Sequence, residues 1–149
     1  MIVMGSDGIS HLASHVRQKL LPSTSDPYTS SDLRFTAMCL DLIAEDYDRA
    51  ADVFSADRQE MADVFAHALP DLDGDMRGRV SARLESRPEN LRVRTLTQVV
   101  DDDLRVLIDL HREVEKPERV DQPWAGRLSA KIWMFLESYA RRRVYRSPI

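Results

Sequence analysis

Three polar residues in one short segment have side chains suited to acid–base chemistry: Asp103, Arg105 and His111. A carboxylate and an imidazole can exchange protons near neutral pH, and a guanidinium binds anionic groups. If these side chains converge, they can serve a small helical hydrolase or nuclease. This enzyme is one alternative function that the sequence offers.

The spacing of Arg105 and His111, with five residues between them, resembles that of HEPN-type helical ribonucleases. Those enzymes usually carry a polar residue directly after the arginine, and here Val106 stands in that place. On a regular helix the two side chains also project about 120° apart, rather than into one cleft. The sequence therefore favours a protein without catalysis of its own.

Asp103 also conflicts with the apolar pattern around it. Its helical position lies about 40° from Leu107, inside the apolar stripe of the segment, and His111 lies at the other edge of that stripe. A carboxylate on an apolar face costs several kcal/mol unless it is paired or neutralised. We expect either a buried pair with one of the 18 arginines or a helix break near residue 101 that turns Asp103 outward. The stripe consists of Val93, Leu96, Val100, Leu107 and Val114.

The C-terminal segment combines arginines with aromatic residues. Cations at a helix C-terminus are favoured by the helix dipole, but four are more than a cap needs. Trp133 adds a second apolar flank, so that the apolar arc of this helix spans about 200°. One neighbouring helix cannot cover that arc, and the helix is either sandwiched inside the domain or forms an interface. The predicted interface or anion-binding residues are Trp133, Arg141, Arg142, Arg143 and Arg146.

Other candidate sites are incomplete. His11 and His15 have a spacing that can bind metal, but no third ligand is evident. The single cysteine, Cys39, has no basic neighbour on its helix face, which argues against a nucleophile. We therefore predict no metal and no cofactor. A ridge of acids is predicted to be solvated or to bind a basic partner; it consists of Asp41, Glu45, Asp48 and Asp52.

Apolar residues recur at spacings of three and four along the chain, and no strand pattern stands out. The sequence predicts an all-α fold, a single bundle of five to six mainly antiparallel helices. Asp57 and Glu60 have the spacing of a capping box and predict a helix start near residue 58. The predicted helices span about 7–21, 32–54, 58–69, 74–86, 89–115 and 122–146.

The chain of 149 residues predicts one domain, 1–149, with a flexible linker at 22–31 after the first helix. The net charge of −4 argues against a nucleic-acid binder, although a nucleic-acid-binding regulator that uses the arginine tail is a further alternative. No apolar run is long enough for a membrane span, and one cysteine fits a reducing cytoplasm. The leading hypothesis is a non-catalytic cytoplasmic interaction protein that docks a protein partner or a second copy through its C-terminal helix.

Overall fold

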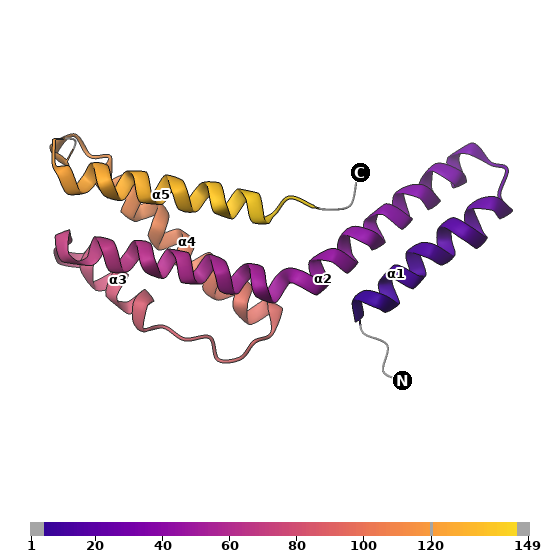
Figure 1. Ribbon diagram of the computed structural model, residues 1–149, viewed down its shortest axis with the longest axis horizontal. Helices are drawn as coiled ribbons and strands as arrows, with labels where there is room; N and C mark the ends of the chain where they lie inside the picture. The colour runs from indigo at the N-terminus through magenta and orange to yellow at the C-terminus, as the bar shows by residue number, and fades with distance from the viewer. Residues whose placement is uncertain (1–4, 120, 146–149) are drawn as a thin grey trace. The chain divides into compact units, whose positions relative to one another are not determined.

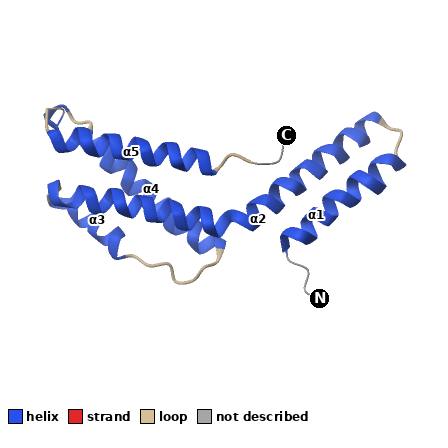
Figure 2. Cartoon of the chain, in the orientation of Figure 1, coloured by secondary structure: helices blue, strands red, loops and turns tan. Residues whose placement is uncertain are grey.

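The computed structural model describes residues 5–119 and 121–145, and the regular elements in these ranges are all helical (Figures 1 and 2). The predicted all-α class is confirmed. Short π and 3-10 turns, η1 (Val16–Leu20) and η2 (Leu21–Ser23), extend α1 toward the next helix, and η3 (Leu69–Asp71) follows α2. The α-helices are α1 (Gly5–His15), α2 (Pro27–Ala68), α3 (Gly74–Glu85), α4 (Val93–Val114) and α5 (Pro123–Arg142).

The helix α2 begins earlier than the sequence pattern indicates. Asp26 is its N-cap: the Oδ2 atom accepts the backbone N–H of Thr29 at 2.8 Å and its hydroxyl at 2.6 Å. Pro27 occupies the first helical position, where its fixed φ suits a helix start. The linker predicted at 22–31 is therefore mostly helical, and only residues 24–26 lie outside helical geometry.

The same helix also continues where two helices were predicted. The predicted boundary between 54 and 58 is wrong, because α2 runs unbroken through it. Between Pro27 and Pro70 the sequence has neither proline nor glycine, so nothing in the backbone ends the helix. Asp57 and Glu60 are consequently interior helix residues, and the capping-box interpretation is wrong.

The helix α4 begins later than predicted. Pro88 does not open it; Arg92 is the N-cap residue, and the first helical residue is Val93. The side chain of Asn90 accepts the backbone N–H of Arg92 at 3.0 Å, which stabilises a turn rather than a helix. The helix then passes through residues 101–103 without the break that was one of our alternatives.

The described chain groups into two compact units. The first consists of residues 5–50 with Tyr145, and the second of Ala51–Val144. The first unit pairs α1 with the N-terminal half of α2, and its buried residues are small: Ala13, Val16, Ala37 and Ala44. The organisation as a single domain stays a prediction.

The second unit contains the main hydrophobic core. The C-terminal half of α2 packs with α3, α4 and α5 around side chains such as Phe65, Leu110 and Ile132, each at most 1% exposed. Removing such side chains from water is the main force that holds these four segments together. The core positions one face of each helix and leaves the opposite faces for solvent or partners. In the described residues, we find no helix with the length and apolar character that a membrane span requires.

Candidate functional site

The arginines at the end of α5 bind α2 in the second unit. Arg142 donates from Nε to Oδ1 of Asp57 at 2.7 Å and from Nη1 to Oε1 of Glu60 at 2.6 Å. Arg143 donates from Nη2 to Oδ2 of Asp57 at 2.6 Å. Asp57 is 0% exposed, and each of its carboxylate oxygens accepts a hydrogen bond from a guanidinium group. Such charge-assisted bonds are stronger than neutral ones.

The electrostatics of this cluster are balanced, since two guanidinium groups meet two carboxylates. Burial alone would lower the pKa of Arg142, but hydrogen bonds to Glu60 and Asp57 raise it above its ordinary value. The guanidinium carbon of Arg143 also lies 3.3 Å from the ring centroid of Tyr139, in a cation–π contact. Arg142 and Arg143 therefore fix α5 to α2, and this intramolecular role replaces the predicted docking role for these two residues.

The other predicted arginines lie differently. Arg141 is 73% exposed and donates from Nη2 to Oε1 of Glu137, one turn earlier, at 2.5 Å. Arg146 lies outside the described residues. Arg141 is thus the one predicted arginine that the described residues leave mainly in solvent.

Asp103 is buried within the second unit. It is 3% exposed, and its Oδ1 atom accepts the Nε–H of Arg83 at 2.5 Å. The Nε atom of Arg58 lies 3.6 Å from Oδ2. Burial raises the pKa of Asp103 above its ordinary value, while the hydrogen bond from Arg83 opposes that shift. Of the two arrangements expected from the sequence, the structure has the buried pair.

The three residues of the enzyme alternative do not converge. Asp103 bonds Arg83 of α3, whereas Arg105 is 70% exposed and bonds Asp102 at 2.8 Å. His111 has its ring edge-on to Trp133, with centroids 5.6 Å apart. Asp103, Arg105 and His111 therefore face different surroundings, and the structure provides no shared point at which they act on one substrate.

Comparisons with protein-family models, curated proteins and solved structures found no match to this chain.

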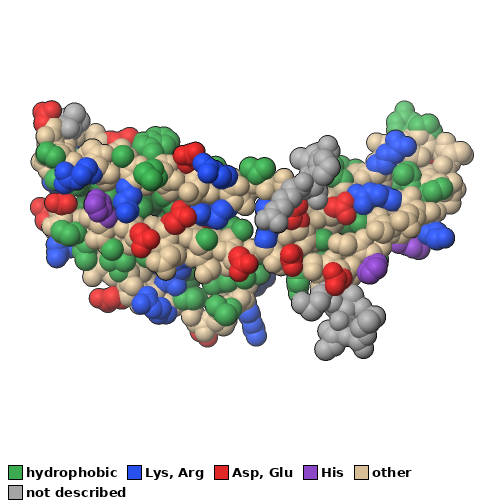
Figure 3. All heavy atoms as spheres, viewed as in Figure 1, with side chains coloured by type: hydrophobic (Ala, Val, Ile, Leu, Met, Phe, Trp, Pro, Cys, Tyr) green, Lys and Arg blue, Asp and Glu red, His purple; other side chains and the backbone are tan. Residues whose placement is uncertain are grey.

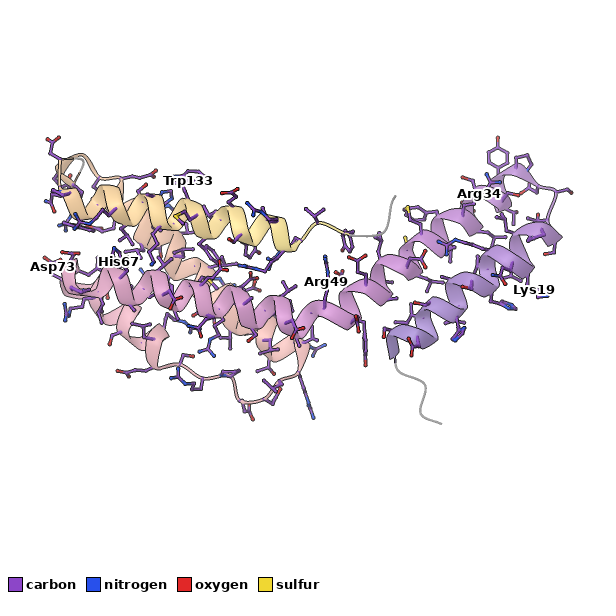
Figure 4. All side chains as sticks on the ribbon, in the orientation of Figure 1. Lys19, Arg34, Arg49, His67, Asp73 and Trp133 are labelled. Atoms are coloured by element: carbon purple, nitrogen blue, oxygen red, sulfur yellow. The ribbon has the colours of Figure 1, made fainter. Side chains whose placement is uncertain are left out.

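Trp133 lies on the outer side of α5, away from α2 (Figure 4). Its side chain is 59% exposed, and Met134, which follows it, is 69% exposed. Ile108 of α4 is 51% exposed and lies one turn before His111, the residue that the Trp133 ring contacts. Hydrophobic side chains are open to solvent along this edge of α5 in Figure 3. We call Ile108, His111, Trp133 and Met134 the Trp133 surface.

The first unit has an apolar face of its own. Phe35, which is 63% exposed, projects on the side of α2 opposite the buried Ala37, and Ile43, which is 52% exposed, projects about 100° from the buried Ala44. The first unit therefore leaves these two apolar side chains of α2 open to solvent.

The acidic ridge is partly paired within the first unit. Asp41 bonds Arg17 of η1, and Glu45 pairs with Arg49 at 3.2 Å. Among the described residues, no group of three histidine, cysteine, aspartate or glutamate side chains is arranged to hold a metal ion. Two of the four carboxylates of the ridge therefore form ion pairs inside the first unit.

The feature that sequence reasoning missed is Asp57. The signal was present, because Phe54, Asp57 and Met61 share one face of a helix and the two flanking residues are apolar. The same conflict of a carboxylate with an apolar stripe identified Asp103. Asp57 was assigned instead to a helix cap, which removed it from the stripe.

Proposed function

We propose that this protein is a non-catalytic interaction protein that docks through the Trp133 surface. The observation that carries the proposal is Trp133 itself, a tryptophan 59% exposed on a unit whose core is otherwise well covered. Tryptophan is enriched among the residues that dominate binding energy at interfaces. Exposed Met134 and Ile108 extend the apolar area on both sides of it.

The contact we propose is apolar rather than electrostatic. Two exposed arginines of α4 and α5 are paired: Arg141 with Glu137, and Arg112 with Asp109 at 3.2 Å. Arg142 and Arg143 bind carboxylates of α2. Most of the arginine run is therefore not available to attract an acidic partner. Binding is expected to depend weakly on salt, since ion pairs at the rim contribute little.

The partner we propose is a second copy of this chain. In an isologous contact the same patch of both copies meets, so the exposed apolar residues of the Trp133 surface can cover those of a second copy. The apolar face of Phe35 and Ile43 supports an interaction role in general, because it is a second unpartnered surface. We place this homodimer in the cytoplasm, a compartment that suits a chain whose single cysteine, Cys39, is free.

The experiment is sedimentation equilibrium with the full chain and three variants. Trp133→Glu puts a charge at the centre of the proposed contact, where charged residues are depleted. Phe35→Glu does the same on the first unit, and Ala82→Glu is the matched control, because it adds a carboxylate at an exposed position of α3. The proposal predicts a dimer for the parent, Phe35→Glu and Ala82→Glu proteins, and a monomer with unchanged helicity for Trp133→Glu.

Two results would overturn the proposal. If the parent protein stays monomeric at about 100 μM, well above a micromolar dissociation constant, the chain does not pair with itself. If Phe35→Glu alone produces the monomer, the contact lies on the first unit and not at Trp133. Circular dichroism of each variant separates a lost contact from a lost fold.

A further inference from the structure

A cavity of about 760 Å³ lies within the second unit. It is bounded by α2, α3, α4 and the segment that joins α3 to α4. Its volume falls in the range of small-molecule sites, about 300–1,000 Å³. Its apolar lining includes Phe54, Leu84, Leu91, Leu96 and Val100.

The inner wall of this cavity is apolar and little exposed to water. Leu96 is 6% exposed and Val100 2% exposed, and Phe65 of α2 is 1% exposed. An apolar body that enters here replaces water against these side chains, which is favourable in proportion to the apolar area covered.

The cavity wall carries three arginines and three aspartates, but its poorly exposed charges do not balance. The side chains of Arg58 and Arg83 are 19% and 18% exposed, and both face Asp103, whose side chain is 4% exposed. Two guanidinium groups thus share one carboxylate in a place with little water. A poorly hydrated charge without a counter-charge is costly. An anion would neutralise this surplus.

A third arginine lies at the mouth of the cavity. Arg87 is exposed, and its Nη1 atom donates to the carbonyl oxygens of Leu84 and Ser86, each at 3.0 Å. Asp52 and Asp63 also line the cavity, and like Arg87 both are exposed to water, where charges are screened. They therefore do not compensate the two inner arginines.

We propose that this cavity binds a small amphipathic monoanion, with its anionic head at Arg58 and Arg87 and its apolar body against Phe54 and Leu84. A guanidinium presents a planar fork of donors that matches a carboxylate or a sulfonate. This site is separate from the Trp133 surface and goes beyond the proposed docking function.

The probe is 1-anilinonaphthalene-8-sulfonate, an aromatic sulfonate that fluoresces in apolar sites. It is titrated into the full chain and then displaced with decanoate or with decanol, which has the same apolar body and no charge. We expect fluorescence enhancement, displacement by decanoate, and displacement by decanol that is about tenfold weaker, the effect of losing one hydrogen bond to a charged group.

Variants at the mouth test the assignment without disturbing the core. Arg87→Gln removes the outer cation, and Leu91→Glu places a carboxylate beside the head at a residue that is 80% exposed. Each is expected to weaken decanoate binding about tenfold. The matched control, Arg94→Gln, removes an exposed arginine near the start of α4 and should leave binding unchanged.

Several outcomes would overturn the inference: no probe binding, equal displacement by decanol and decanoate, or equal affinity in Arg87→Gln and Arg94→Gln proteins. Loss of the probe signal in Trp133→Glu would also overturn it, because the dye would then report the Trp133 surface. Retention of the signal in that variant keeps this test independent of the proposed docking function.

Discussion

The guanidinium of Arg142 and the carboxylate of Asp57 meet across 85 residues of sequence, with Nε 2.7 Å from Oδ1. This bond fixes the C-terminal end of α5 to the middle of α2, within the second unit. Because Asp57 is fully buried, its charge is compensated by protein groups, here Arg142 and Arg143. The cluster gives a structural role to two of the arginines at the end of α5.

Asp57→Ala is predicted to lower the free energy of unfolding by about 3–5 kcal/mol, the usual cost of removing one partner of a buried ion pair. Arg143 loses its carboxylate partner and Arg142 keeps only Glu60. The measurement is the denaturant midpoint of unfolding for the parent and the variant.

Asp63→Ala is the control, because Asp63 is an exposed residue of the same helix. Its effect is expected to stay within about 0.5 kcal/mol. Equal midpoints for the Asp57 and Asp63 variants would show that the buried pair contributes nothing to stability.

Asp103 is predicted to contribute more to the free energy of unfolding at low pH than at neutral pH, the reverse of a typical aspartate. Burial raises the pKa of Asp103 above the unfolded value of 3.8, so the folded protein binds the proton more tightly than the unfolded chain. The contribution of this group is therefore largest at low pH and declines as pH rises from about 4 through the folded pKa. Urea unfolding of the parent and of Asp103→Asn at several pH values measures this difference.

Asp109, in the same helix, is predicted to contribute to stability with the opposite dependence on pH. A hydrogen bond from Arg79 holds the pKa of Asp109 below 3.8, so its contribution is present above that pH and is lost as pH falls through the folded pKa. The free energy difference between the parent and Asp109→Asn should therefore rise with pH. A difference for Asp103→Asn that also rises with pH would mean that its pairing with Arg83 outweighs burial.

The N-cap of α2 gives a third prediction. Hydrogen bonds from the hydroxyl and the backbone N–H of Thr29 lower the pKa of Asp26. Asp26→Ala should increase hydrogen exchange in the first turns of α2, because the cap that satisfies these donors is lost. The parent should show the same increase as pH falls below the ordinary aspartate range, after correction for the intrinsic exchange rate. Asp32→Ala, one turn into the helix, should leave exchange unchanged; equal effects of both variants would contradict the cap.

The helical class could be predicted from the sequence, but several helix boundaries could not. Apolar spacing identified α3 almost to the residue and placed α5 correctly, because both segments have prolines or glycines near their ends. The spacing placed a false boundary in α2, since Asp57 and Glu60 match a local capping pattern. Only the tertiary contact with Arg142 distinguishes an interior aspartate from a cap.

The surroundings of the candidate sites were predictable only in part. The excess of acids in residues 26–75, 13 against 3 bases, and the excess of bases in 122–149, 6 against 1, indicated that such segments pair. The net charge of a segment does not identify which side chains form a pair. The sequence therefore predicts a contact with a partner for Arg142 and Arg143, whereas in the structure both bind α2. The cavity beside Arg58 and Arg83 was not predicted, because its walls come from three helices and a connecting segment.

The central claim is that the Trp133 surface contacts a second copy, and fluorescence quenching of Trp133 tests it most directly. A Trp124→Phe protein leaves Trp133 as the single tryptophan. Acrylamide quenching is measured from about 1 μM to about 100 μM protein, a range that brackets a micromolar dissociation constant. The account predicts that the quenching constant falls as concentration rises, because the exposed indole becomes covered. A high quenching constant that is the same at every concentration would contradict it.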